Sequence, residues 1–87
     1  MKIKDGFILR EVAKNYVVVA VGSAAKDFNC IISLNETGAF LWKQLEKDVT
    51  EEQLLNAMLN EYEVEEDIAK KDIKAFIEKV SKANLLK

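Results

Sequence analysis

The pattern of hydrophobic and polar positions divides the chain into two halves. Residues 6–34 are rich in Val, Ile and Phe, in short runs separated by turn residues, and this pattern is typical of β-strands. Residues 35–87 place their apolar side chains at the three- and four-residue spacing of amphipathic helices. No Pro-, Gly- or Ser-rich linker separates the halves, so we expect a single domain over residues 1–87. Strands followed by helices predict an α+β fold with one shared core.

The first half predicts a three-stranded meander. We expect strands at 7–12, 16–21 and 28–34, and the second is apolar on both faces, as a central strand should be. Residues 13–15 would form a tight connection in which Asn15 adopts the left-handed conformation.

The predicted third strand would lie at an edge of this sheet. Residues 29–34 contain no charge and no Pro, which are the features that usually protect an exposed edge. Either another part of the fold covers the edge, or the edge pairs with an extended peptide or with the same strand of a second copy. A helix beside the edge would then form the second wall of a groove.

Three helices are predicted in the second half. The first begins after Asn35, a good N-cap, and the second opens with the capping box of Thr50 and Gln53. The third runs over residues 66–83, where apolar residues recur at spacings of three, four and seven residues. Asn84 fits a residue in the left-handed conformation just beyond the end of this helix.

Composition excludes most kinds of catalytic and metal site. The chain has no His and one Cys, so it lacks a Ser-His-Asp triad, an imidazole metal site and an internal disulfide. Its three glycines stand apart and form no phosphate-binding loop. We expect Cys30 to be a buried structural thiol and Trp42 to be a core residue. Gly38 is expected to allow close backbone packing of the first helix. We therefore expect no enzyme, no metal site and no cofactor.

Charge and hydropathy limit the partners and the compartment. The longest apolar run has six residues, 16–21, whereas a membrane span needs about 20, so no membrane partner is expected. A lone thiol suits the reducing cytoplasm. The net charge of −2 argues against a dedicated nucleic-acid binder. It divides unevenly, because residues 51–67 carry seven acids and no base, while residues 68–87 carry six Lys against two acids.

Three segments carry a family resemblance: Gly6-Phe7-Ile8-Leu9-Arg10-Glu11-Val12, Tyr16-Val17-Val18-Val19 and Leu34-Asn35-Glu36-Thr37-Gly38-Ala39-Phe40-Leu41-Trp42. Asp72, Phe76-Ile77 and Asn84-Leu85-Leu86 extend the similarity over nearly the whole chain, which thus resembles the PqqD family. The resemblance implies a three-stranded antiparallel sheet followed by three helices, similar to a winged helix-turn-helix.

The resemblance also implies a function without catalysis. PqqD-like domains bind the leader of a ribosomally synthesised precursor peptide as an added strand, between the third strand and the third helix. They present the peptide to a modifying enzyme, often a radical S-adenosylmethionine (SAM) enzyme, in the biosynthesis of ribosomally synthesised and post-translationally modified peptides (RiPPs) or of pyrroloquinoline quinone.

Carried onto this chain, the resemblance places a peptide-binding site on two elements. The third strand would supply backbone hydrogen bonds, and one border of the third helix would supply Ile68 and Phe76 as an apolar pocket with Asp72 and Lys79 as a polar rim. Phe76 also fits a core position. The full candidate set is Asn29, Cys30, Ile31, Ile32, Ser33, Leu34, Ile68, Asp72, Ala75, Phe76 and Lys79.

Two other functions remain open at this point. A winged-helix nucleic-acid binder would use the lysines of the third helix and bind duplex DNA in a salt-dependent way. A self-associating structural domain would form a homodimer by pairing its third strands across a two-fold axis.

Overall fold

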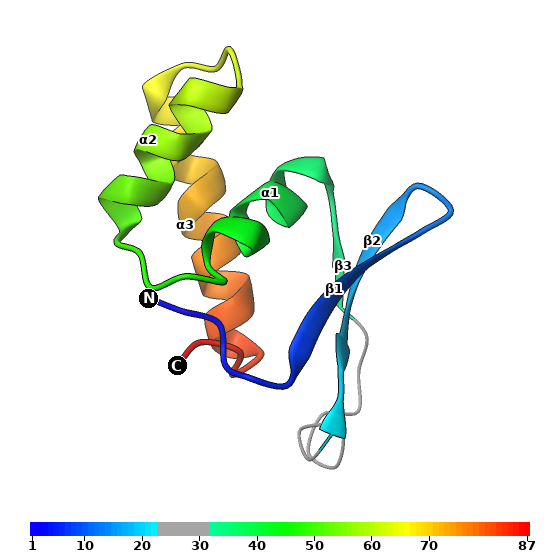
Figure 1. The fold of residues 1–87 in the computed structure, drawn as a ribbon. Helices are drawn as coiled ribbons and strands as arrows, with labels where there is room; N and C mark the ends of the chain where they lie inside the picture. The colour runs from blue at the N-terminus through cyan, green and yellow to red at the C-terminus, as the bar shows by residue number, and fades with distance from the viewer. Residues whose placement is uncertain (23–31) are drawn as a thin grey trace.

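The computed structural model describes residues 1–22 and 32–87 and confirms the α+β class. Three strands form an antiparallel sheet in the order β1-β2-β3, and three helices follow, an arrangement compatible with a winged helix-turn-helix (Figure 1). The elements in chain order are β1 (Phe7–Val12), β2 (Asn15–Ala20), β3 (Ile32–Leu34), α1 (Glu36–Gln44), α2 (Glu51–Glu61) and α3 (Glu66–Lys82).

The β1–β2 hairpin corrects the predicted turn. Ala13 and Lys14 form it alone, with φ values of 49° and 70°, and Asn15 pairs with Val12 as the first residue of β2. A two-residue hairpin turn with positive φ at both positions matches the right-handed twist of the strands, which explains why the turn is this short. The prediction of a left-handed Asn15 is therefore wrong, and the second strand lies one residue earlier than expected.

The predicted third strand, residues 28–34, falls only partly within the described residues. β3 begins at Ile32 and pairs with β2 through Tyr16↔Leu34, Val17↔Ser33 and Val18↔Ile32. Residues 28–31 of the predicted strand, which include Asn29, Cys30 and Ile31, lie outside the described residues.

Capping side chains set the starts of α1 and α2, as predicted. The Gly38 N–H donates to Asn35 Oδ1 over 2.8 Å, and Thr50 and Gln53 complete both hydrogen bonds of the capping box. A Cβ atom on Gly38 would lie 3.0 Å from Asn35 Oδ1 and 3.3 Å from Leu34 Cβ. The predicted close packing at Gly38 is thus the packing of α1 on its own cap and on the end of β3.

The end of α3 is a Schellman motif. Asn84 has a φ of 61°, its N–H donates to the Ser81 carbonyl, and the Leu85 N–H donates to the Val80 carbonyl over 2.9 Å. The left-handed Asn84 is confirmed, and α3 ends at Lys82, one residue earlier than predicted. The motif folds Leu85 back into the core, where it is fully buried.

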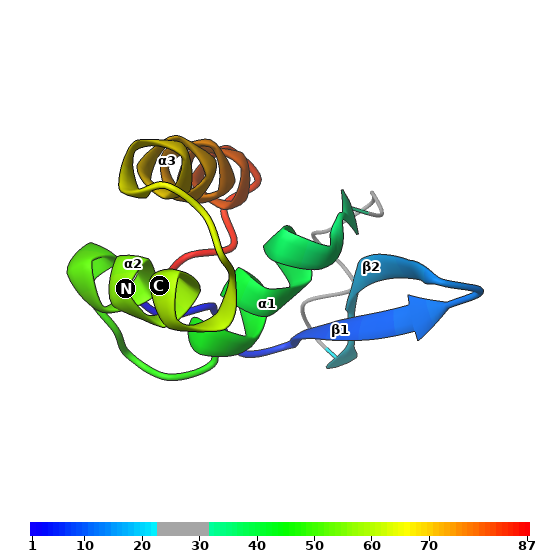
Figure 2. The same cartoon turned by 90° about the horizontal axis from the view of Figure 1, so that it is seen from above.

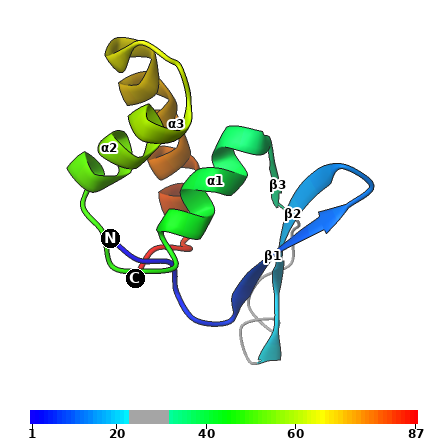
Figure 3. The same ribbon diagram turned by 45° about the horizontal axis from the view of Figure 1, so that its top comes forward.

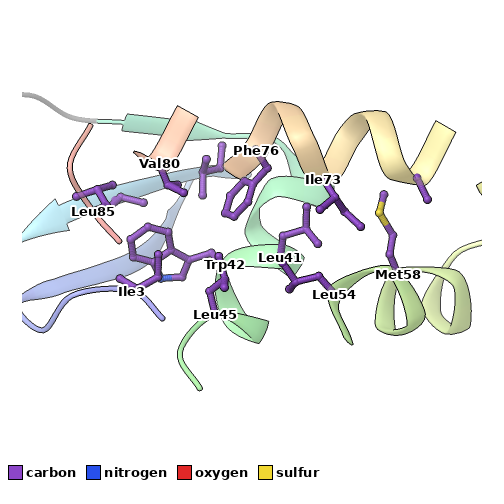
Figure 4. Packing of buried hydrophobic residues seen from close by; sticks show 13 residues of the cluster. Ile3, Leu41, Trp42, Leu45, Leu54, Met58, Ile73, Phe76, Val80 and Leu85 are labelled. Atoms are coloured by element: carbon purple, nitrogen blue, oxygen red, sulfur yellow. The ribbon is translucent and has the colours of Figure 1, made fainter. Parts of the chain in front are cut away.

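The core lies where the three helices meet the sheet. In Figure 2, α1 lies between the strands and the α2–α3 pair, and Figure 4 shows Leu41 and Trp42 of α1 facing Ile73, Phe76 and Val80 of α3. Trp42 is 1% exposed, which confirms its prediction as a core residue.

Both ends of the chain complete this core. The Ile3 side chain is buried, its N–H donates to the Leu45 carbonyl, and Ile3 forms an isolated antiparallel bridge with Leu86. The Lys4 N–H donates to the Leu85 carbonyl over 2.8 Å. The termini therefore lie close together (Figure 3).

Candidate functional site

A groove lies between α3, the end of β3 and the first turns of α1. Its volume is about 330 Å³. Figure 1 shows how these elements are arranged, with α3 on one side, β3 on the other and the start of α1 between them. The residues that line it are Leu34, Asn35, Thr37, Gly38, Leu41, Asp72, Ala75, Phe76 and Lys79.

The sheet register decides which backbone groups of β3 face away from β2. In a two-residue hairpin the closing pair, Val12↔Asn15, is hydrogen-bonded, and such pairs alternate along an antiparallel ladder. The backbone N–H and C=O of Val17 are therefore hydrogen-bonded to β1. Those of its neighbours Tyr16 and Val18 are hydrogen-bonded to Leu34 and Ile32 of β3. The N–H and C=O of Ser33 consequently face away from β2, at the outer edge of the sheet.

The Ser33 carbonyl receives a hydrogen bond from α3. Lys79 Nζ donates to Ser33 O over 2.7 Å, although the two residues are 46 positions apart in the chain. Both side chains are exposed. The contact joins the two walls that the sequence predicted for a peptide site.

The α3 wall of the groove is apolar in its middle and charged at its ends. Asp72 and Lys79 are seven residues apart, about 10 Å along the helix, and Ala75 and Phe76 lie between them. Phe76 is 6% exposed, belongs to the core cluster and also lines the groove. Phe76 is therefore a core residue, as one prediction had it, and its small exposed surface lies at the groove.

The structure brings together about half of the predicted site residues. Leu34, Asp72, Ala75, Phe76 and Lys79 line the groove, and Ser33 contributes its carbonyl.

The remaining predicted residues lie elsewhere. Ile32 packs against the core cluster instead of lining the groove. Ile68 is 48% exposed, one helical turn before Asp72, and is not among the lining residues. Asn29, Cys30 and Ile31 lie outside the described residues.

Sequence reasoning missed the contribution of α1 to the groove. The groove lining includes Asn35, Thr37, Gly38 and Leu41. The sequence predicted Asn35 only as a helix cap and Gly38 only as a position of close packing. A signal was present, because a strand that passes into a helix through a single capping residue must place that helix's first turn against the strand end. The cap and the groove wall are thus the same residues.

A second hollow separates α2 from α3 on the described surface. Its apolar lining is Leu55 and Ile73, and its charged lining is three acids, Glu51, Glu52 and Glu66, and two lysines, Lys70 and Lys74. Within residues 1–22 and 32–87, no helix is long and apolar enough to span a membrane. The same ranges contain no cluster of three or more His, Cys, Asp or Glu side chains that could hold a metal ion.

Comparison with known families agrees with the resemblance seen in the sequence. The family model described as coenzyme PQQ synthesis protein D (PqqD) matches residues 8–86. The match covers nearly all of the chain, and the protein therefore belongs to the PqqD family. No curated protein matches the chain significantly.

Two solved structures share the fold. The first, TbiB1 in complex with the TbiA(beta) leader peptide, has a TM-score of 0.76 and 22% identity and covers 100% of this chain and 95% of its own. The second, lasso peptide synthetase B1 complexed with the leader peptide, has a TM-score of 0.71 and 19% identity, with coverage of 97% and 93%. At these identities the likeness establishes a common fold over the whole length of the molecule.

Proposed function

We propose that this protein is a peptide-binding adaptor that holds the leader of a ribosomally synthesised precursor peptide as an added strand beside β3. One observation carries the proposal: the outward-facing Ser33 carbonyl lies at the edge of a groove whose other wall is α3. An added strand needs main-chain acceptors for affinity and side-chain pockets for specificity, and in this proposal the Ser33 carbonyl is such an acceptor and the groove lining forms the pocket.

Membership of the PqqD family and the common fold support the same function. The two similar structures are both described as complexes with leader peptides, and both match this chain over almost its full length. In this proposal the groove side of Phe76 and the Ala75 surface receive an apolar peptide side chain, and Asp72 and Lys79 form the polar rim.

The adaptor needs a second protein for the chemistry. The proposal includes a peptide-modifying enzyme, a radical SAM enzyme or another RiPP enzyme, as the recipient of the bound peptide. The chain itself carries no His and a single Cys, which limits the catalytic groups that it could offer. Binding and delivery are therefore the roles assigned to it, in RiPP or pyrroloquinoline quinone biosynthesis.

Amide chemical shifts test the proposed site directly. The chain contains no Pro, so every residue after the first has a backbone amide to follow. We would titrate the ¹⁵N-labelled protein with leader peptides from the short precursor reading frames beside its gene. The expected result is a set of saturable shifts at Ile32–Leu34 and along Asp72–Lys79, with none from scrambled peptides.

A blocking substitution provides the matched control. Ala75 is exposed and lines the groove, so Ala75→Trp should fill it and weaken leader binding at least tenfold, whereas Asn60→Trp on the exposed surface of α2 should bind normally. Shifts confined to α2, or no response to any of these leaders, would contradict the proposal.

The two alternative functions make separate predictions. Duplex DNA binding through α3 predicts a gel shift that weakens steeply with salt. Pairing of third strands predicts a concentration-dependent dimer in sedimentation experiments.

A further inference from the structure

The edge acceptor that an added strand would use is already engaged by a charged side chain. Within β3 (Ile32–Leu34), only Ser33 directs its backbone groups away from β2, and Lys79 Nζ donates to its carbonyl over 2.7 Å. Charged side chains, Lys above all, are a common protection for sheet edges. Here the protecting side chain comes from the opposite wall of the groove.

An added strand would compete with Lys79 for this carbonyl. A ladder hydrogen bond places a peptide N–H in line with the acceptor, at the edge where the ammonium now lies. Among the described residues, the ion pairs join the Met1 amine to Asp48, Lys82 to Glu78, and Lys87 to Asp5. In this structure Lys79 therefore has no ion pair with a carboxylate of the described residues, and its ammonium is bound to the Ser33 carbonyl.

We propose that Lys79 selects peptides that carry an acidic side chain near Ser33. The added strand displaces the Lys79 ammonium from the Ser33 carbonyl, and the peptide carboxylate then forms an ion pair with that ammonium. This inference rests on the proposed peptide-binding function and names the charge class of its ligand. At the other end of the groove wall, Asp72 repels an acid. The groove therefore favours a strand with its acid at the Lys79 end and a neutral or basic side chain at the Asp72 end.

The exposure of Lys79 limits the size of the selection. Water hydrates the displaced ammonium at a partly open site, so a neutral peptide is disfavoured and still binds. Exposed charge pairs change equilibrium constants by about two- to fivefold, and a groove that excludes some water raises this to about tenfold. We expect a three- to tenfold preference, which is graded and not absolute.

A random linear peptide library displayed on phage tests the inference without a known ligand. Wild-type protein, Lys79→Met and Lys79→Arg are each used for selection, with Lys82→Met as the matched control because Lys82 is an exposed α3 lysine that pairs with Glu78. Enriched peptides are then synthesised with Glu or with Gln at the acidic position, and their Kd values are measured. Urea denaturation verifies that each variant is folded.

The expected result has three parts. Peptides selected by the wild type share one Asp or Glu, and the Glu form binds three- to tenfold more tightly than the Gln form. Lys79→Met removes this preference, whereas Lys79→Arg and Lys82→Met keep it.

Two groups of results would overturn the inference, and only the second would also overturn the proposed peptide-binding function. Enriched peptides without a shared acid, or a preference that survives Lys79→Met, reject the role of Lys79 and leave peptide binding intact. A library that yields no binder, or binders that leave the amides of Ile32–Leu34 unshifted, rejects the inference together with the proposed function. Equal binding of the Glu and Gln peptides to wild-type protein rejects the inference even if a Lys79 variant fails to fold.

Discussion

Asn35 links the start of a helix to the wall of the groove. Its Oδ1 accepts the Gly38 N–H over 2.8 Å and also the Thr37 hydroxyl over 3.1 Å. The same residue follows β3 directly and lines the groove. A single side chain thus holds the first turn of α1 in the position that closes one end of the site.

We predict that Asn35→Ala lowers the free energy of unfolding by about 1 kcal/mol, since an orphan N–H of α1 loses its acceptor. Asn35→Asp is the matched control, because a carboxylate caps equally well and favours the helix dipole. Urea denaturation followed by far-UV circular dichroism measures both. Equal stability of Asn35→Ala and wild type would show that the cap contributes nothing.

Tyr16 and Glu11 form a cross-strand pair with a pH signature. The Glu11 carboxylate, through its charge and its hydrogen bond, raises the pKa of Tyr16 above the usual value of about 10. The folded state therefore favours the protonated phenol. Its contribution to stability is complete below the unfolded pKa and is lost as the pH rises through the higher folded pKa.

Glu11→Gln should lower the Tyr16 pKa and reduce this alkaline loss of stability. The titration is best read as tyrosinate absorbance in a Tyr62→Phe background, because burial also raises the pKa of Tyr62. Phenylalanine keeps the edge-to-face ring contact with Phe40, whose centroid lies 5.4 Å from that of Tyr62. An unchanged midpoint after Glu11→Gln would contradict the assigned cause.

At the scale of elements, the β1–β2 hairpin holds two non-glycine residues in a conformation that suits glycine. Ala13 and Lys14 have φ values of 49° and 70° and are exposed. A left-handed conformation costs an L-residue with a Cβ atom about 1 kcal/mol. The pairing of the two strands compensates for this cost in the folded protein.

Lys14→Gly should therefore stabilise the protein by a net of about 0.3 kcal/mol, because the relief of the turn slightly exceeds the cost of the greater flexibility of glycine in the unfolded chain. Lys14→Ala is the control, because it removes the charge and keeps the Cβ atom, and it should leave stability nearly unchanged. Thermal and urea unfolding measure both variants. A destabilised Lys14→Gly would mean that unfolded-state entropy outweighs relief of the turn.

At the scale of the whole molecule, the two ends of the chain fasten the helices to one another. Ile3 and Leu85 are buried in the same core cluster as Trp42, and the Lys87 N–H donates to the Lys2 carbonyl over 2.8 Å. Because residues near both ends of the chain are part of the core, a substitution that disrupts either end should lower the free energy of unfolding of the whole domain.

We predict that Leu85→Ala lowers the free energy of unfolding by about 3 kcal/mol, as expected for a fully buried leucine. Leu86→Ala, at a partly buried neighbour, should cost less. Fluorescence of Trp42, the one Trp of the chain, and far-UV circular dichroism should report coincident transitions. Two separate transitions would show that the strands and helices unfold as different units.

Local interactions explain which features could be predicted from the sequence. The caps at Asn35 and Thr50 act over three residues, and the apolar spacing of α3 repeats within two turns, so both are readable in a short window. The hairpin turn was misread because Asn15 is the better left-handed residue by itself. Strand pairing overrode that local preference.

By itself, the sequence determined the order of strands and helices, the caps of α1 and α2, and the core identity of Trp42. It also indicated four of the α3 residues that line the groove: Asp72, Ala75, Phe76 and Lys79. Only the tertiary structure decided that Asn35 and Gly38 complete the groove, that Ile68 lies beside it, and that Lys79 holds the Ser33 carbonyl. The physical reason is sequence separation. A contact across 46 residues depends on how packed helices and a sheet register bring two distant atoms together, and no local pattern encodes it.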